Sequence, residues 1–155
     1  MIIDWEFCHF TELDVLKLHK IYAARQAVFI IEQNCVCPDA ADDYDPVSHH
    51  LTGWRRDKTG DREVAAYLRI IPPGKKFAEP SLGRVLTAKS VRGAGLGREL
   101  MRRGIDKARE TYPDCAIRIS AQHYLEKFYR DLGFVPVSGI YDEDGIPHVA
   151  MVLAG

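Results

Sequence analysis

The sequence predicts an α/β fold in which one central sheet combines antiparallel hairpins with parallel crossovers. Three observations lead to this prediction. Strand-like and helix-like segments follow one another in the order β-α-β-β-β-α-β-α-β-β. A polar turn at residues 57–61 separates two apolar segments, which is typical of a hairpin. A strand at residues 82–88 runs into a loop with three glycines, and a helix follows at once.

The first half of the chain supplies a strand, a helix and a hairpin. Residues 2–8 mix apolar and acidic side chains and are predicted to form a strand. Thr11 to Asp14 resemble a capping box, so a helix is expected to begin there and to fade near Asn34. Residues 35–48 are rich in Asp and Pro and are predicted to be a loop. The hairpin strands are expected at residues 50–55 and 63–71.

The second half is built around the glycine loop. A helix over residues 95–111 presents an apolar stripe, and Pro113 ends that unit. A short strand at 116–121 precedes a helix that carries Leu125 to Leu132 on one face and ends at Gly133, a left-handed cap. The last strands are expected at residues 134–140 and 148–153.

Composition limits the protein class. A chain of 155 residues is most simply a single domain, residues 1–155, with a real core. The net charge of −1 gives no reason to expect nucleic acid or an anionic membrane as a partner. Apolar runs are too short to span a bilayer and no signal peptide is evident, so a cytoplasmic location is expected. The four cysteines are interpreted as free thiols rather than as a disulfide framework or a metal site; they are Cys8, Cys35, Cys37 and Cys115.

The glycine loop is the strongest functional signal. Glycines allow close approach of the backbone, and N–H groups at a helix start point outward at the positive end of the dipole, so the loop is suited to a diphosphate. The spacing of Gly93, Gly95 and Gly97 fits neither a P-loop nor the G-x-G-x-x-G dinucleotide loop. A tight turn without a ligand is the alternative. Arg92 with two of these glycines fills R-x-x-G-x-G, the acyl-CoA signature of the GNAT acetyltransferases.

Further segments extend this resemblance over about residues 2–152. Residues 128–134 are similar to the F-Y-x-x-x-G-F segment of GNAT enzymes, and residues 25–33 resemble R-x-x-V-F-x-x-E-Q. With Ser120-Ala121-Gln122 and the run at 141–148, they resemble the ElaA-like branch of the superfamily. The resemblance implies a GNAT-like fold with a mixed central β-sheet of six to seven strands and about four flanking helices.

The resemblance also implies which residues hold acetyl-CoA, the expected co-substrate. The last residues of the strand before the loop would pair with the pantetheine amides, and the loop and helix start would hold the diphosphate. Many GNAT enzymes carry Asn where this chain has Gln122, which has a longer arm. The expected cofactor-binding residues are Val85, Leu86, Thr87, Arg92, Gly93, Ala94, Gly95, Leu96, Gly97, Arg98 and Gln122. No metal is expected.

The expected catalytic residues are Tyr129, Glu32 and His148. Tyr129 matches the family's proton donor to the CoA thiolate, with Tyr124 as the weaker candidate. An amine acceptor must lose a proton, and the residues considered for this task are Glu32, ranked first, His50, Glu143 and His148.

The predicted function is N-acetyl transfer from acetyl-CoA to a primary amine, by direct attack in a ternary complex. The acceptor is a small molecule or peptide. Acidic residues at 39–45 and 142–144 favour a cationic one. A homodimer is an expected assembly. Two alternatives are an acyltransferase for longer acyl chains and a non-catalytic acyl-CoA-binding module.

Overall fold

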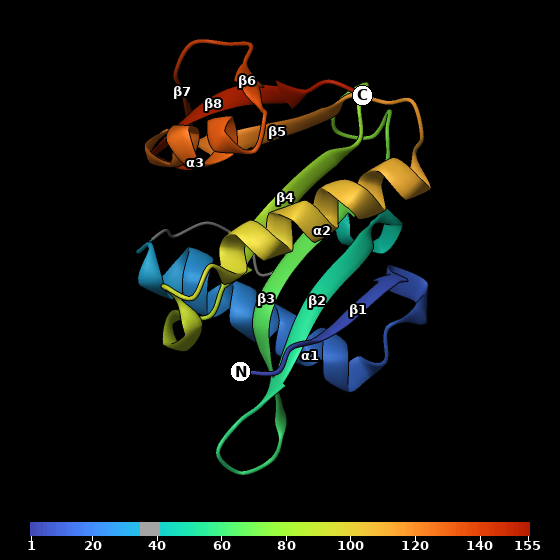
Figure 1. The fold of residues 1–155 in the computed structure, drawn as a ribbon, viewed down its shortest axis with the longest axis vertical. Coiled ribbons are helices and arrows are strands. Elements are labelled where there is room, and N and C mark those ends of the chain that lie inside the picture. Colours follow the sequence, from blue (N-terminus) through green and yellow to red (C-terminus); the bar gives the residue numbers. More distant parts are fainter. Residues whose placement is uncertain (35–40) are drawn as a thin grey trace.

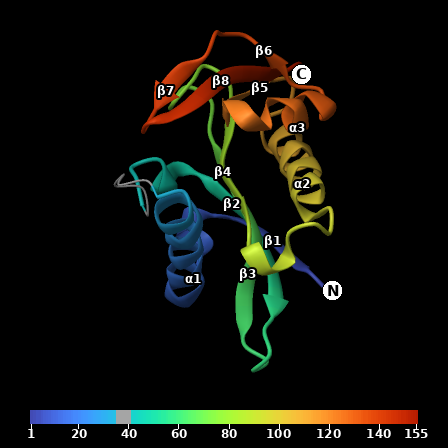
Figure 2. The same cartoon turned by 90° about the vertical axis from the view of Figure 1, so that its left-hand side faces the viewer.

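A computed structural model describes residues 1–34 and 41–155. The described chain forms one mixed sheet of eight strands, in the order β1-β2-β3-β4-β5-β8-β6, with β7 paired to β8 (Figure 1). Helix α1 lies on one face of the sheet, and α2 and α3 lie on the other (Figure 2). This confirms the predicted α/β fold with one mixed central sheet, which has more strands than expected. The strands are β1 (Asp4–His9), β2 (His49–Arg56), β3 (Arg62–Ile71), β4 (Ser81–Thr87), β5 (Ile117–Gln122), β6 (Val135–Pro136), β7 (Tyr141–Glu143) and β8 (Ile146–Leu153); the α-helices are α1 (Val15–Arg25), α2 (Leu96–Thr111) and α3 (Glu126–Asp131).

The sheet opens between its two halves. Strands β1 to β4 pair antiparallel, and β5, β8, β6 and β7 form a second antiparallel group. The halves meet at the parallel strands β4 and β5, whose register holds a single pair, Ser81 with Arg118. After this pair the two strands diverge (Figure 1). The edge of β4 that leads to the glycine loop therefore faces a gap in the sheet.

A β-bulge bends β4 inside this gap. Tyr67 pairs with Leu86 and Arg69 pairs with Gly83, so β4 holds one residue more than β3 over this stretch. Arg84 adopts φ +52, a left-handed conformation uncommon for a residue with a side chain. Bulges raise local twist and interrupt pairing, which fits the divergence of β4 from β5.

The first helix begins later than predicted and changes type. Glu12 and His9 form a capping box on a short 3-10 turn, while Asp14 caps α1 by accepting a hydrogen bond of 2.8 Å from Lys17 N. The expected start at Thr11 was wrong because the capping box lies two residues earlier, on a separate turn. After α1, the segment η2 (Gln26–Glu32) winds as a π-helix, a form often found at functional sites.

The C-terminal strands also differ from the prediction. The expected strand at 134–140 is limited to Val135–Pro136, since Pro and Gly interrupt its ladder. Strand β8 begins at Ile146 rather than at residue 148 and forms a hairpin with β7. Asp144 and Gly145 join the two strands with φ +54 and +80, as an Asp-Gly hairpin turn requires.

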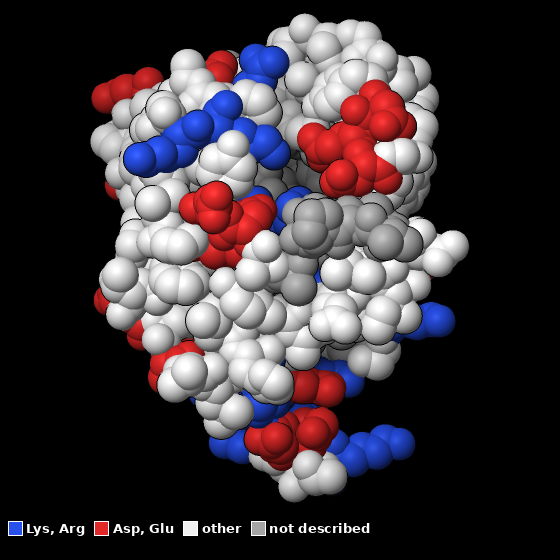
Figure 3. Space-filling model, turned by 180° about the vertical axis from the view of Figure 1, so that it is seen from behind, with Lys and Arg blue, Asp and Glu red and all other residues white. Residues whose placement is uncertain are grey.

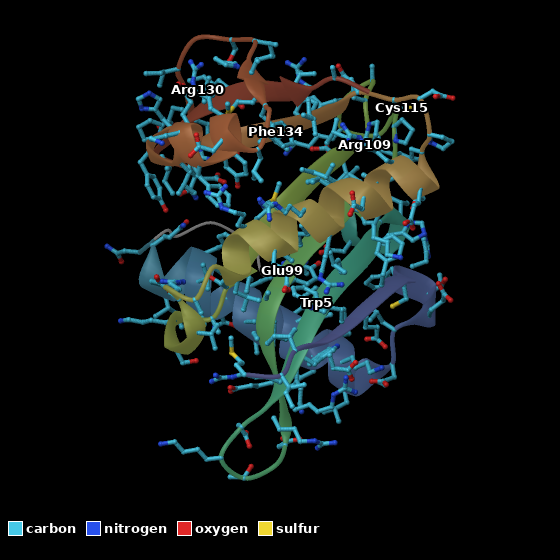
Figure 4. The ribbon with its side chains drawn as sticks, in the orientation of Figure 1. Trp5, Glu99, Arg109, Cys115, Arg130 and Phe134 are labelled. Atoms are coloured by element: carbon cyan, nitrogen blue, oxygen red, sulfur yellow. The ribbon has the colours of Figure 1, made fainter. Side chains whose placement is uncertain are left out.

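Two apolar clusters hold the helices to the sheet. The larger lies under α2, where Leu100 and Met101 are fully buried. Figure 4 shows Trp5 and Phe134 on this side; the Arg103 guanidinium lies 4.7 Å from the Trp5 ring, and Phe134 contacts Tyr129 edge to face. The smaller cluster packs α1 against β3 through residues that include Ile21 and Tyr67.

The C-terminus is fastened near the end of α2. Arg109 on this helix donates a hydrogen bond of 3.2 Å to the Ala154 carbonyl, and Cys115 lies in the same region (Figure 4). Cys115 and Cys8 are free thiols. Cys35, Cys37 and Asp39 lie outside the described residues. Over residues 1–34 and 41–155, no helix has the length and apolar character needed to cross a membrane.

A buried group of ion pairs lies beneath the loop at 42–45. Asp45 accepts from Arg25 at 2.7 Å and from Arg69 at 2.9 Å, and all three side chains are almost completely buried. Asp42 accepts two further hydrogen bonds from Arg69, at 2.5 and 2.7 Å, and its Oδ2 lies 3.3 Å from a guanidinium nitrogen of Arg84. Two of the aspartates predicted to attract a cationic acceptor are thus engaged by arginines of the fold, whereas Asp43 is exposed.

His50 is buried next to this group, and its titration predicts an acid-sensitive fold. Its Nδ1 lies 2.6 Å from the Tyr67 hydroxyl and its Nε2 lies 3.1 Å from the Asp45 carbonyl. Burial lowers the pKa of His50 from 6.5 to about 4. Below pH 6.5 the imidazole binds a proton more readily in the unfolded chain than in the folded protein. The contribution of neutral His50 to the free energy of unfolding is therefore complete above pH 6.5 and is lost as the pH falls towards 4. The shift corresponds to about 3 kcal/mol.

Urea unfolding at several pH values tests this expectation. The free energy of unfolding should decrease as the pH is lowered from 7 to 4. Its dependence on pH should be weaker in His50→Gln, which has no imidazole at this position to protonate. Exposed His123 provides the control, because His123→Gln should leave the slope unchanged. Equal slopes in wild type and His50→Gln would contradict the prediction.

Candidate active site

The gap between β4 and β5 forms the floor of a cleft of about 400 Å³. The cleft is lined from both halves of the sheet and from the π-helical segment. It collects most of the residues that the sequence singled out, which are Glu32, Val85, Leu86, Thr87, Arg92, Gln122, Tyr129 and His148. His50 does not line this cleft. Because His50 is buried and both its ring nitrogens have partners, it is poorly placed to receive a proton from an acceptor.

The glycine loop lies at one end of the cleft and presents an uncapped helix start. Gly95 is the N-cap of α2 with φ +76, and no side chain caps the helix. Gly93 has φ +91, and a Cβ at either position would meet nothing within 4 Å. The first N–H groups of α2 are therefore open to an anion at the positive end of the helix dipole.

The remaining loop residues differ in exposure. Ala94 and Arg98 are exposed, whereas Leu96 turns into the core. Gly97 lies beside the cleft, where an added Cβ would be 3.9 Å from both Phe128 and Thr87. The loop thus fits the close approach of a diphosphate.

Arg92 is held by a carboxylate and a carbonyl. Its guanidinium forms a two-pronged ion pair with Glu32, with one hydrogen bond of 3.0 Å, and it donates to the Thr87 carbonyl at 3.0 and 3.3 Å. The hydrogen bond from Arg92 lowers the pKa of Glu32. A diphosphate at the loop would compete with Glu32 for this guanidinium.

Gln122 takes part in an amide pair across the cleft. It ends β5, and its side chain exchanges two hydrogen bonds of 3.3 and 3.4 Å with Gln33, which follows the π-helical segment. This pair and the Glu32–Arg92 ion pair both connect the end of η2 to the cleft rim. The sequence did not single out Gln33 as a site residue.

Tyr129 lies in the cleft wall on α3. Its ring is almost entirely buried and packs edge to face against Phe128 and Phe134 at 5.1 and 6.0 Å. Burial raises the pKa of Tyr129 to about 12. The phenol therefore stays protonated at neutral pH and is available as a hydrogen-bond donor. Tyr124 also borders the cleft, but its side chain is mostly exposed.

A second group of polar side chains lies on the β5–β7–β8 wall. His148 directs Nδ1 to the Ile146 carbonyl at 2.7 Å and Nε2 to Glu143 at 3.2 Å. The other Glu143 oxygen accepts from Ser120 at 3.2 Å, and Ser120 also contacts the Tyr141 hydroxyl. Because a carbonyl can only accept, Nδ1 carries a proton, and Nε2 faces the Glu143 carboxylate.

The structure adds polar residues that sequence reasoning missed. Arg69 and Lys76 line the cleft, and Ser120 joins Glu143 to Tyr141. Arg69 had a detectable signal, because a charged residue inside an apolar strand must be paired when it is buried. Lys76 gave no such signal in the sequence, because a lysine in a Pro/Gly-rich loop is usually solvated.

Comparisons with known proteins agree with this geometry. Residues 60–154 match the family described as Acetyltransferase (GNAT) domain. ElaA of Escherichia coli is 36% identical over 97% of this chain and 95% of that protein. A UPF0039 protein of Synechocystis sp. is 40% identical over 98% of this chain and 96% of its own length.

Solved structures give the same result. An acyl-CoA N-acyltransferase from Pseudomonas aeruginosa superposes with a TM-score of 0.90 at 35% identity, covering 99% of this chain and all of that one. The crystal structure of E. coli ElaA gives a TM-score of 0.89 at 34% identity, covering 98% and 99% of the two chains. The chain therefore belongs to the GNAT acyl-CoA acyltransferases and, within them, to the ElaA-like family.

Proposed function

We propose that the protein transfers an acetyl group from acetyl-CoA to a primary amine, on a small molecule or a peptide, by direct attack in a ternary complex. The observation that carries this proposal is the opening between β4 and β5. Past the Ser81–Arg118 pair, β4 has no partner on its β5 side among the described strands. An extended pantetheine chain would use this edge as an added strand.

The cleft supports each binding task with a different element. The uncapped start of α2 and the loop at 92–97 suit the diphosphate. Val85, Leu86 and Thr87 suit the pantetheine, and an N–H near the bulge at Arg84 would stabilise the negative charge that develops on the thioester oxygen. A single donor of this kind is worth about 3–4 kcal/mol in other enzymes.

Tyr129 is the proposed donor to the leaving thiolate. A phenol with a pKa of about 12 is a weaker acid than a thiol of pKa about 8.5, so complete proton transfer is uphill. Its contribution is therefore a hydrogen bond that strengthens as the C–S bond breaks and charge builds on sulfur. The position of Tyr129 in the cleft wall supports this role.

The Glu143–His148 pair is the proposed base. It lines the acceptor side of the cleft, and a neutral His148 with its proton on Nδ1 keeps the lone pair of Nε2 free beside Glu143. Nε2 can therefore take a proton from an ammonium, and the carboxylate stabilises the resulting imidazolium. Glu32 stays a candidate, but its ion pair with Arg92 and its lowered pKa favour a role in positioning that arginine. A cationic acceptor is supported by Glu143 rather than by Asp42 or Asp45. A cytoplasmic location and a homodimer stay predictions.

A thiol-release assay tests the proposed function. Acyl-CoAs of increasing chain length are offered with a panel of amines, polyamines and peptides, and N-acylation is verified by mass spectrometry. We expect acetyl-CoA to give the highest kcat/KM. If kcat/KM is highest for a longer acyl chain, the protein is an acyltransferase but the acetyl assignment is wrong. Binding of CoA without turnover would indicate a binding module.

Binding at the glycine loop is tested separately by Gly97→Ala. Free CoA at about 100 times its Kd should stabilise the fold by about 2.7 kcal/mol, which raises Tm by about 5–10 °C. An alanine at position 97 meets only ordinary contacts and suits a helix better than glycine, so the ligand-free Tm should hold or rise. The added methyl group would occupy space needed by the diphosphate, and most of the CoA-induced shift should be lost.

The control is Gly139→Ala, whose added methyl group meets nothing within 4 Å and lies outside the cleft. It should keep the full shift. A full CoA-induced rise in Tm in Gly97→Ala as well would mean that the diphosphate does not bind at this loop. Gly97 is preferred to Gly95 for this test because a side chain at φ +76 would strain the backbone itself.

A further inference from the structure

Lys76 is a cation of the cleft that the proposed reaction does not yet use. It lies in the connection between β3 and β4, and its half-buried side chain lines the same cleft as Glu143 and His148. Its Nζ lies 5.5 Å from the centre of the Phe77 ring and 5.9 Å from that of Tyr44. Within residues 1–34 and 41–155, no carboxylate lies within 4.0 Å of this nitrogen.

Lys76 is therefore desolvated, and the carboxylates of the part of the chain that the structure describes do not contact it. Burial lowers the pKa of its ammonium group, and the negative charge of Glu143 opposes this effect. Arg69 and Arg84, which are both paired with Asp42, also line the cleft; their positive charges lower this pKa further, and Asp42 raises it. A half-buried ammonium in this setting would gain from an anionic group brought by a ligand.

The far side of the cleft carries the opposite charge. Glu143 on β7 faces the cleft with His148. In Figure 3, basic side chains gather on one side of a hollow and an acidic group lies across from them, while a second acidic group lies just below the basic one. A ligand that carries an ammonium and a carboxylate matches both sides, whereas a simple amine matches one.

The position of Lys76 separates it from the cofactor diphosphate. Lys76 precedes β4, whereas the glycine loop follows it. Seven residues of extended chain span about 20 Å, so the two ends of β4 are too far apart for one diphosphate to contact both. Lys76 therefore acts at the acceptor end of the cleft.

We propose that the acceptor is an amine that carries its own free carboxylate, such as an amino acid or a short peptide, and that Lys76 binds this carboxylate. The inference rests on the proposed function. The amine nitrogen, placed beside Glu143 and His148, forms a bond to the thioester carbon as the C–S bond breaks. The thiolate leaves with the hydrogen bond from Tyr129, and the surplus amine proton passes to the Glu143–His148 pair.

Paired acceptors test this proposal. Amino acids with increasing spacing between amine and carboxylate are each compared with their own carboxamide, which removes the negative charge and keeps the amine. For the best spacing, kcat/KM should favour the free acid by about tenfold or more. Lys76→Met should remove this preference by raising KM for the acid, with little change for the carboxamide.

The neighbouring Lys75 provides the matched control, because it is exposed and does not line the cleft. Lys75→Met should keep the preference for the acid. Equal use of acid and carboxamide by the wild type, or a preference that survives Lys76→Met, would overturn the inference while leaving the acyltransferase intact.

A binding experiment separates this failure from failure of the proposed function. Absence of thiol release with every acceptor would overturn the proposed function alone. Calorimetric titration of the same acids into the CoA-saturated protein then decides the inference. Binding that is lost in Lys76→Met and kept in Lys75→Met supports it, whereas no binding of any acid, or binding unaffected by Lys76→Met, overturns it.

Discussion

Replacing Tyr129 by Phe is expected to lower kcat about 100-fold or more, with the Kd for CoA nearly unchanged. The substitution removes one hydroxyl and keeps the ring, which packs between Phe128 and Phe134. The fold should therefore be preserved. Because the hydroxyl has no hydrogen-bond partner among the described residues, its loss should not open a buried polar network. Steady-state kinetics and the CoA-induced shift in Tm measure the two effects separately.

Tyr124→Phe is the matched control for this experiment. Tyr124 borders the same cleft but its side chain is 73% exposed, so its hydroxyl is solvated. Its removal should change kcat by less than about twofold. A large loss in Tyr124→Phe together with an active Tyr129→Phe would transfer the donor role to Tyr124.

The pH profile gives a further readout for Tyr129. Since burial raises its pKa to about 12, the phenol stays protonated throughout the accessible alkaline range. Ionisation of Tyr129 should therefore cause no loss of activity at any pH below 10. The contrary result would be an alkaline decline in the wild type that is absent from Tyr129→Phe. Such a decline would mean that the Tyr129 phenol ionises at a much lower pH in the working enzyme than its burial in the free protein implies.

The sequence predicted the local parts of this fold well. Periodicity located α2 because its apolar stripe is long and regular, and Gly133 was correctly read as a left-handed cap, with φ +102. Two local signals were misread. The His9–Glu12 capping box lies before the predicted helix start, and the Asp144–Gly145 turn marks a hairpin that was not expected.

The arrangement of the cleft was harder to predict because it depends on distant segments. The opening between β4 and β5 follows from a single strand pair and a bulge at Arg84, and neither has a distinct local pattern. The Gln33–Gln122 amide pair joins residues 89 positions apart. The family resemblance pointed to Tyr129 and the glycine loop, but it could not show that Glu32 is engaged by Arg92.

Replacing Asp45 by Asn should destabilise the fold by about 3–5 kcal/mol. Asn has nearly the same shape, but it removes the charge that neutralises Arg25 and that, together with Asp42, neutralises Arg69; both arginines are almost fully buried. Removing one partner of a buried ion pair costs far more than the pair contributes, because the remaining charge stays desolvated. Urea unfolding followed by circular dichroism measures the change in the free energy of unfolding.

The same loop supplies a control and an independent pH test. Asp43→Asn removes an equal charge from an exposed position and should change stability by less than about 0.5 kcal/mol.

Burial alone would raise the pKa of Asp45, but the ion pair with Arg25 prevails and the pKa is lowered below 3.8. The stabilisation from Asp45 is therefore complete above that pH and is lost as the pH falls through the lower folded value. The stability difference between wild type and Asp45→Asn should narrow in that acidic range. A difference that is small at pH 7, or equal in Asp43→Asn, would mean that the buried arginines are neutralised by other groups.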